Sequence, residues 1–283
     1  MELKNVDLYQ YCGMDKPAQA DGVLTCYMQK SDVVHTLRKR PGMLLLPGGG
    51  YEHVSGREGE PVALQLLAAG YQVFILQYSV TDTRFPVALR EAAMAMRYIR
   101  EKADLLGVNA GQVAAMGFSA GGHLCGTLGM LYDSPEVADI GPARLLRPDG
   151  LALCYPVVVS WGNTHGGSFR NLCGENEALR QYLSLEKLVR PDMPPVFLWH
   201  TRNDDCVPCR NSLMLAVALE EAGVDFVLHI YRNGQHGVST ADHQVYPVGK
   251  VPVVSWDVPG WSEAMCRFFA ELGFAVQDEG ENA

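Results

Sequence analysis

A serine stands in the middle of a glycine-rich segment, GFSAG (117–121), between two apolar runs of the chain. The spacing G-x-S-x-G between a strand and a helix is typical of a nucleophile elbow, a sharp turn that exposes the serine hydroxyl. The small residues leave room for the turn, and the helix that follows directs its N–H groups and positive dipole end at the site. The pattern indicates that Ser119 is a nucleophile. A glycine-rich turn that merely contains a serine is the alternative.

Acidic and imidazole side chains follow two later apolar runs. Asp204 and Asp205 come after "PPVFLWH", and His236 comes after "DFVLHIYR" within "NGQHG". A histidine can remove a proton from a serine while a carboxylate fixes its tautomer and stabilises its charged form. Taken singly, either aspartate reads as a turn or helix-capping residue and the histidine as a solvated one. Together the order Ser, Asp, His predicts a triad of the α/β-hydrolase type.

Three glycines, Gly48 to Gly50, end the early apolar run "GMLLLPGGG". Glycine lets a backbone approach a ligand closely, and backbone N–H groups can stabilise a developing oxyanion. We expect Gly49 or Gly50, together with Ala120, to supply these N–H groups. A plain flexible turn is the alternative.

The elements that must position these residues alternate between apolar strands and helical patterns. The sequence predicts strands within 42–50, 71–80, 112–118, 151–160, 195–201 and 225–232, and helices at 61–70, 86–107, 121–132, 211–223 and 261–273. Ser55 and Glu58 match a capping box before the first helix. Such alternation predicts an α/β fold, with a mostly parallel central sheet flanked by helices on both faces. Ligands of such sheets bind beyond the carboxyl ends of the strands, where the candidate residues fall.

Composition excludes several other classes of function. The net charge of −9 disfavours nucleic acid and anionic membrane as partners. The longest apolar run, LALCYPVVV (151–159), is shorter than the roughly 18 residues of a transmembrane helix. The eight scattered cysteines and the lack of a visible signal peptide lead us to expect a reduced, cytoplasmic protein.

Neither a metal nor a cofactor is expected. Cys206 and Cys209 form a single C-x-x-C without a second pair at zinc spacing, so a redox role stays open and a fortuitous pair is favoured. The glycine-rich segments lack the lysine of a phosphate-binding loop. His123, His229 and His243 are interpreted as structural or surface residues.

From about Met43 to Ser239 the chain resembles α/β-hydrolase esterases that include bacterial acetyl xylan and bifunctional acetyl xylan/feruloyl esterases. The resemblance rests on "PGGGY", "GREGEPVA", "GFSAGGHL", "PPVFLWHTRNDDCVP" and "NGQHG". It implies that Ser119 is the nucleophile, His236 the base and Asp204 rather than Asp205 the acid. Related esterases often carry histidine where this chain has Pro47.

The resemblance also implies one domain over residues 1–283, with a short cap-like insertion at about 161–190. Tyr51 and Trp161 are candidates for the pocket, with ordinary packing as the alternative for both. The implied activity is hydrolysis of small acyl esters, with O-acetyl groups on sugars or oligosaccharides, or small aryl esters, as the substrates. A peptidase or amidase of the same fold and a non-catalytic binding protein are alternatives. The oligomeric state is left open.

Overall fold

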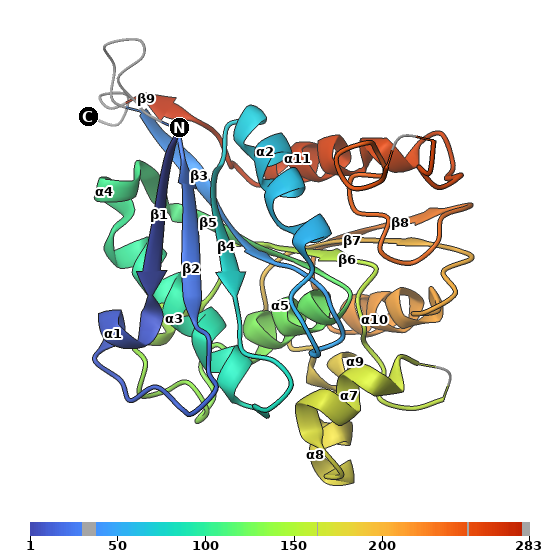
Figure 1. Ribbon diagram of the computed structural model, residues 1–283, viewed down its shortest axis with the longest axis horizontal. Helices are drawn as coiled ribbons and strands as arrows, with labels where there is room; N and C mark the ends of the chain where they lie inside the picture. The colour runs from blue at the N-terminus through green and yellow to red at the C-terminus, as the bar shows by residue number, and fades with distance from the viewer. Residues whose placement is uncertain (30–37, 163, 248, 279–283) are drawn as a thin grey trace.

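The computed structural model describes residues 1–29, 38–162, 164–247 and 249–278 (Figure 1). Nine strands of these ranges form one sheet in the order β1-β2-β4-β3-β5-β6-β7-β8, with β9 beside β3. The antiparallel strands β1 and β2 lie at one edge, and β4, β3, β5, β6, β7 and β8 are mutually parallel. The strands are β1 (Glu2–Asp7), β2 (Val23–Met28), β3 (Arg38–Leu46), β4 (Gln72–Gln77), β5 (Val108–Phe118), β6 (Leu151–Cys154), β7 (Val196–Thr201), β8 (Phe226–Tyr231) and β9 (Gln277–Asp278).

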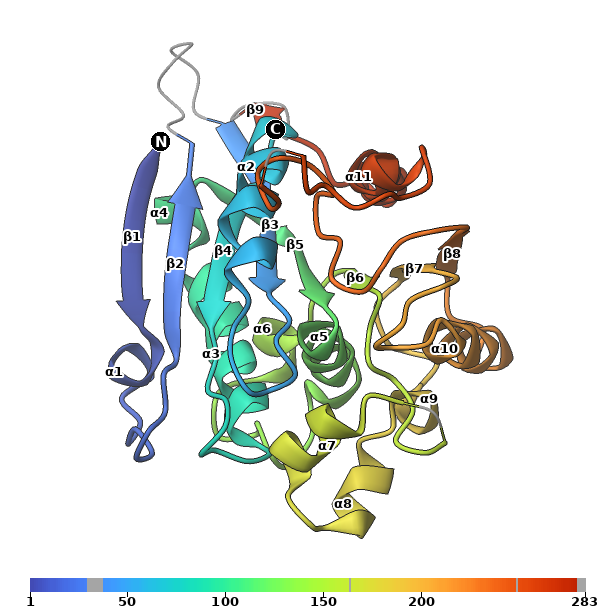
Figure 2. The same cartoon turned by 45° about the vertical axis from the view of Figure 1, so that its right-hand side comes forward.

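Helices cover both faces of the sheet (Figure 2). They are α1 (Leu8–Cys12), α2 (Glu60–Ala68), α3 (Val87–Glu101), α4 (Ala103–Leu106), α5 (Ala120–Leu131), α6 (Ala143–Leu146), α7 (Gly166–Cys173), α8 (Glu177–Tyr182), α9 (Leu185–Leu188), α10 (Arg210–Glu221) and α11 (Trp261–Glu271). Along β3, Leu44 and Leu46 pack in the core under α3 and α5, whereas Met43 and Leu45 pack in the core under α2 and α11. Burial on both faces explains why these strands read as continuous apolar runs.

The predicted fold class is confirmed, and most predicted elements agree with the structure within a few residues. The single helix predicted over 86–107 is wrong, because it is divided at Lys102 into α3 and α4. The strand predicted over 151–160 ends at Cys154, since Tyr155 adopts a left-handed backbone with φ 37°. The strands β1 and β2 were not predicted. Four of the six residues of β1 are exposed, so it carries little apolar signal.

The capping box predicted at Ser55 and Glu58 is also wrong. The Ser55 side chain makes no capping hydrogen bond at the short 3₁₀ helix Gly56–Glu58. The Glu58 carboxylate is buried and instead accepts hydrogen bonds from two distant groups. The S-x-x-E spacing therefore predicted a local cap, whereas Glu58 makes hydrogen bonds to residues outside its own helix.

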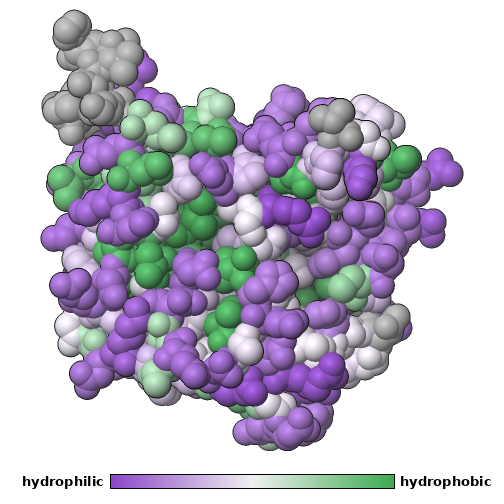
Figure 3. All heavy atoms as spheres, in the orientation of Figure 1, coloured by the Kyte–Doolittle hydropathy of each residue, from purple (hydrophilic) through white to green (hydrophobic). Residues whose placement is uncertain are grey.

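The segment 161–190, between β6 and β7, contains α7, α8 and α9, and α7 and α8 project below the sheet in Figures 1 and 2. Within the described ranges, no helix has the length and apolar character needed to cross a membrane. On the face seen in Figure 3, hydrophilic side chains surround small separate hydrophobic patches. Such a surface is ordinary for a folded chain with a large buried core.

Candidate active site

Ser119 occupies the sharp turn between β5 and α5 that its motif predicts. Its backbone has φ 53° and ψ −117°, a conformation that is strained for any residue but glycine. A Cβ at Gly117 would lie 2.0 Å from the carbonyl oxygen of Gly121, and one at Gly121 would lie 2.1 Å from that of Leu46. Both positions therefore require glycine, because the turn packs against its own helix and against the end of β3.

The structure brings together three of the predicted residues from separate loops. The Ser119 hydroxyl oxygen is 2.8 Å from His236 Nε2, and His236 Nδ1 is 2.7 Å from Asp204 Oδ2. Ser119 follows β5, Asp204 follows β7 and His236 follows β8, so parallel strands deliver all three to one edge of the sheet. This arrangement can pass a proton from the hydroxyl to the imidazole while the carboxylate holds the other ring nitrogen.

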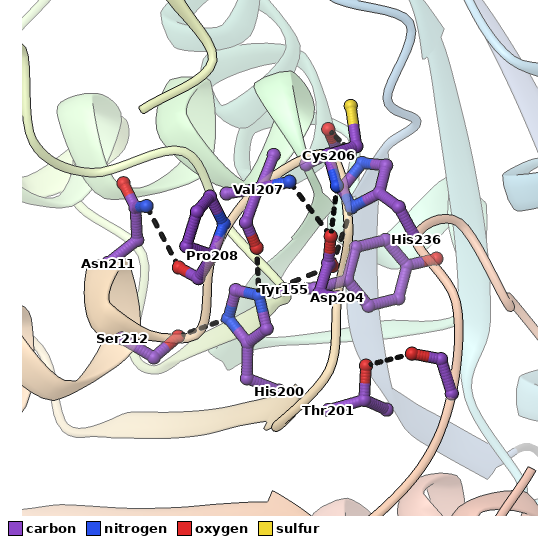
Figure 4. Close-up of polar contacts among 12 residues, drawn as sticks. Tyr155, His200, Thr201, Asp204, Cys206, Val207, Pro208, Asn211, Ser212 and His236 are labelled. Atoms are coloured by element: carbon purple, nitrogen blue, oxygen red, sulfur yellow. Dashed lines mark hydrogen bonds and ion pairs between the residues drawn. The ribbon is translucent and has the colours of Figure 1, made fainter. Parts of the chain in front are cut away.

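Asp204 is held more firmly than a surface carboxylate (Figure 4). Its Oδ1 accepts hydrogen bonds from the backbone N–H groups of Cys206 at 3.0 Å and Val207 at 2.8 Å. Burial by itself would raise the pKa of Asp204, but hydrogen bonds from His200 and His236 outweigh it and hold the pKa well below its usual range. The carboxylate therefore stays ionised and keeps a fixed orientation.

The adjoining Asp205 contacts the same histidine differently. Its Oδ1 accepts a long hydrogen bond, 3.4 Å, from the backbone N–H of His236, and within the described part of the chain no hydrogen bond joins its carboxylate to the imidazole. Asp204, in contrast, contacts the imidazole directly. The geometry thus separates two neighbouring acids that residue type alone left equivalent.

We call residues 47–50 the glycine loop. The Pro47 carbonyl accepts a hydrogen bond of 2.6 Å from the hydroxyl of Tyr78, which anchors the loop without a histidine at position 47. Gly49 and Gly50 have φ of 126° and 68°, and a Cβ at Gly49 would lie 2.0 Å from the carbonyl oxygen of His53. Among the described residues, none accepts a hydrogen bond from the N–H of Gly49 or Gly50, so both donors are available beside Ser119.

A cleft of about 240 Å³ opens at this edge of the sheet and reaches Ser119 and His236. Gly49 and Gly50 form part of its wall. Its other side chains are mostly polar or charged, and they include Glu52, His53, Arg57, Glu58, His165 and Cys206. The cleft therefore presents polar side chains to a ligand beside the Ser119 hydroxyl.

His165 reaches the cleft from the segment 161–190, and no motif in the sequence points to it. Its Nδ1 is 2.8 Å from the Ser168 hydroxyl and accepts from the Ser168 N–H at 3.3 Å, which caps α7. Burial and the nearby His236 lower the pKa of His165. Because Nδ1 accepts the backbone N–H, the neutral ring carries its proton on Nε2.

Neither predicted pocket aromatic lies in this cleft wall. Tyr51 is buried, with its hydroxyl 2.9 Å from His123 Nδ1, and it packs edge-on against Tyr78. Trp161 is 41% exposed and donates from Nε1 to Glu186 at 2.9 Å. The structure therefore favours the packing alternative for Tyr51, whereas Trp161 is a partly exposed residue outside the cleft wall.

Two other sequence features lie near the site. His123 is not part of the Ser119 hydrogen-bond chain, because its two ring nitrogens are hydrogen-bonded to the Tyr51 hydroxyl and to the carbonyl of Leu183. Cys206 and Cys209 are both free thiols, and Cys206 is exposed at the cleft. Over the ranges that the structure covers, no group of histidine, cysteine and acidic residues is arranged to hold a metal ion.

Comparisons with known proteins identify similar hydrolases and two matching family models. Residues 34–141 match the BD-FAE family, and residues 160–251 match the prolyl oligopeptidase family. The chain is 37% identical over 235 residues to endo-1,4-beta-xylanase B of Butyrivibrio fibrisolvens, and 29% identical over 201 residues to an acetylxylan esterase of Xylanibacter ruminicola. These matches cover 79% and 68% of the chain but only 35% and 40% of the two relatives, so the chain spans well under half of their length.

Solved structures match over nearly the whole chain. The acetyl ester-xyloside bifunctional hydrolase of Caldicellulosiruptor lactoaceticus is 33% identical with a TM-score of 0.80, and the match covers 96% of this chain and 97% of that one. The carboxylesterase Cest-2923 of Lactobacillus plantarum is 26% identical with a TM-score of 0.82, covering 98% and 100%. The chain belongs to the esterases of the α/β-hydrolase family.

Proposed function

We propose that the chain is a serine carboxylesterase that removes small acyl groups, above all O-acetyl groups of carbohydrate. The observation that carries the proposal is the continuous hydrogen-bonded chain from Ser119 through His236 to Asp204, of which Ser119 and His236 line a cleft. The polar side chains along the cleft support the carbohydrate part, as do the names of three similar proteins: a xylanase, an acetylxylan esterase and an acetyl ester-xyloside hydrolase.

The mechanism follows from the positions of these groups. His236 Nε2 removes the hydroxyl proton of Ser119 as the oxygen bonds to the ester carbonyl carbon. Ionised Asp204 holds the ring through Nδ1 and stabilises the imidazolium. The N–H groups of Ala120 and of Gly49 or Gly50 take the carbonyl oxygen as it becomes an oxyanion; losing one such donor costs about 10²–10³ in rate.

The intermediate then collapses. The bond to the alcohol breaks, and His236 gives its proton to the departing alkoxide, which leaves an acyl group on Ser119. Water, deprotonated by His236, attacks that acyl group. The proton returns to the Ser119 oxygen, and the carboxylic acid leaves. No step requires a metal or a cofactor.

The remaining parts of the proposal concern context. We assign residues 1–283 to one domain in which 161–190 acts as a small cap, supported by His165 reaching the cleft. The partner is a small-molecule or oligosaccharide ester, with no role for nucleic acid or membrane, given the net charge of −9. A cytoplasmic location is proposed from the scattered cysteines alone.

A peptidase is the second candidate, because residues 160–251 match the prolyl oligopeptidase family. Three kinds of substrate distinguish the esterase from the peptidase: p-nitrophenyl esters of increasing acyl length, an acetylated xylo-oligosaccharide and an aminopeptidase p-nitroanilide. We expect hydrolysis of acetyl esters and of the oligosaccharide, and none of the anilide. Cleavage of the anilide alone would establish the peptidase.

The non-catalytic alternative is tested with the same panel on Ser119→Ala. Removing the serine of such a triad lowers kcat by about 10⁶-fold. Equal rates for wild type and Ser119→Ala would refute the mechanism, and the absence of turnover by either protein on every substrate would support a binding protein.

A further inference from the structure

Glu58 is a buried carboxylate at the point where two loops of the site meet. Only 3% of its surface is exposed, although it lies on a 3₁₀ helix directly before α2. Its Oε2 accepts a hydrogen bond of 2.8 Å from the N–H of Gly48, in the glycine loop. Its Oε1 accepts one of 2.8 Å from the hydroxyl of Tyr155. Burying a carboxylate is costly unless such bonds satisfy it.

Tyr155 carries the connection toward the histidine. Its hydroxyl also accepts a 3.1 Å hydrogen bond from the N–H of Ser239, and the Ser239 hydroxyl donates to the carbonyl of Arg57 at 2.6 Å. The Tyr155 ring packs edge-on against the His236 imidazole, with 5.2 Å between ring centroids. The segment 236–239 is therefore attached to the segment 57–58 at two places, and Tyr155 supports the imidazole from one side.

The glycine loop has little freedom at the same point. A Cβ at Gly48 would lie 2.7 Å from Glu58 Oε2, 2.9 Å from the carbonyl of Phe118 and 3.0 Å from Ser119 Cβ. Gly48 is thus packed between the Glu58 carboxylate and the serine turn. We expect a shift of Glu58 to be passed through Gly48 to the neighbouring Gly49 and Gly50, which line the cleft.

We propose that Glu58 is a positioning residue that fixes the glycine loop and the His236 loop relative to Ser119. The role rests on the proposed esterase function and goes beyond it, because Glu58 acts through Gly48 on one side and through Tyr155 on the other. The carboxylate has two oxygens: Oε2 accepts from the glycine loop, and Oε1 accepts from Tyr155, which contacts the His236 loop. An amide at this position keeps the shape of Glu58 but supplies only one acceptor oxygen.

The kinetic test compares Glu58→Gln and Tyr155→Phe with wild type on p-nitrophenyl acetate. A misplacement of about 1 Å can cost about 10²-fold in rate, so we expect kcat to fall by about 10²-fold in Glu58→Gln with KM nearly unchanged. The double variant should lose less than the product of the two single losses, because both act on one network.

Glu91 supplies a matched control. It is fully buried in α3, its Oε1 accepts from the Tyr9 hydroxyl at 2.9 Å, and its Oε2 accepts from the N–H of Ser79 at 2.6 Å. Glu91→Gln makes the same chemical change outside the cleft. It should lower thermal stability as much as Glu58→Gln while leaving kcat within about twofold.

A second readout does not depend on turnover. The low-field proton resonance of the His236–Asp204 hydrogen bond, assigned by its loss in His236→Ala, should broaden or shift in Glu58→Gln and in Tyr155→Phe, and should be unchanged in Glu91→Gln. An unchanged resonance with wild-type kcat in both site variants would overturn the proposal. If the wild type hydrolyses no ester, the proposed function fails, and the resonance alone decides the role of Glu58.

Discussion

The hydroxyl oxygen of Ser119 lies 2.8 Å from Nε2 of His236, although 117 positions of sequence separate the two residues. The sheet creates this proximity, because β5 and β8 run parallel and end at the same edge. A hydrogen bond of this length is that of a nucleophile and its general base.

The first prediction separates the two adjacent acids. Asp204→Asn should lower kcat about 10⁴-fold, as replacing the triad acid does elsewhere, because an amide favours the wrong imidazole tautomer. Asp205→Asn should stay within a few-fold, since Asp205 is hydrogen-bonded to the backbone N–H of His236 and not to its ring. Initial rates on p-nitrophenyl acetate measure both, and a severe loss in Asp205→Asn alone would reverse the assignment.

The second prediction concerns pH and stability. Burial lowers the pKa of His123 to about 4, whereas an unfolded histidine titrates at about 6.5. Between these values the unfolded chain binds a proton that the folded chain does not, so this residue makes stability fall as pH drops from about 6.5 to 4. One such proton contributes at most about 1.4 kcal/mol per pH unit.

Urea unfolding of wild type and His123→Gln at pH 7, 6 and 5 measures this contribution. The free energy of unfolding should decline more steeply with falling pH in wild type than in the variant. Parallel curves would show that His123 is not buried in its neutral form.

The third prediction tests the clearance at the serine turn. In Gly121→Ala the new Cβ would meet the carbonyl oxygens of Leu46 and Pro47 at 2.1 and 2.3 Å, and backbone must move to make room. We expect a loss of at least about 2 kcal/mol of stability. Gly260→Ala is the control, because a Cβ there meets nothing within 4 Å. Thermal unfolding measures both variants. If Gly121→Ala unfolds at the same temperature as Gly260→Ala, the turn is not as tightly packed as the structure indicates.

The fourth prediction concerns the thiol at the cleft. Cys206 is exposed beside the site, and its partial burial and the nearby Asp204 and Asp205 raise its pKa. N-ethylmaleimide should therefore inactivate the enzyme slowly at pH 7 and faster as pH rises toward 9, because the thiolate is the reactive form. The Cys206→Ser variant should resist inactivation by N-ethylmaleimide, and the Cys209→Ser variant should be inactivated like the wild type. If the Cys209→Ser variant resists inactivation instead, the reactive thiol is Cys209 and the prediction is wrong.

The parts of the site that could be predicted from sequence are those with local signals. The turn at Ser119 needs glycines at fixed spacing, and Asp204 and His236 each lie within five positions of the end of an apolar strand. Parallel strands then bring such loops together, so order along the chain was informative. The fold class could be predicted because apolar strands and helical patterns alternate along the chain.

What the sequence could not indicate depends on distant contacts. Glu58 matched a capping box three positions after Ser55, but its partners are Gly48 and Tyr155. Local spacing does not report a hydrogen bond across 97 positions. The division of the long helix at Lys102 was hidden for a related reason, since its apolar pattern continues into α4.

Covalent labelling of Ser119 tests the central claim most directly. A p-nitrophenyl phosphonate transfers its phosphonyl group to an activated serine, and the intact mass and a peptide map then locate the adduct. We predict one adduct per chain, on the peptide that contains Ser119, with activity lost in proportion and no adduct in Ser119→Ala. Labelling at another residue, or full activity in protein that carries the adduct on Ser119, would contradict the account.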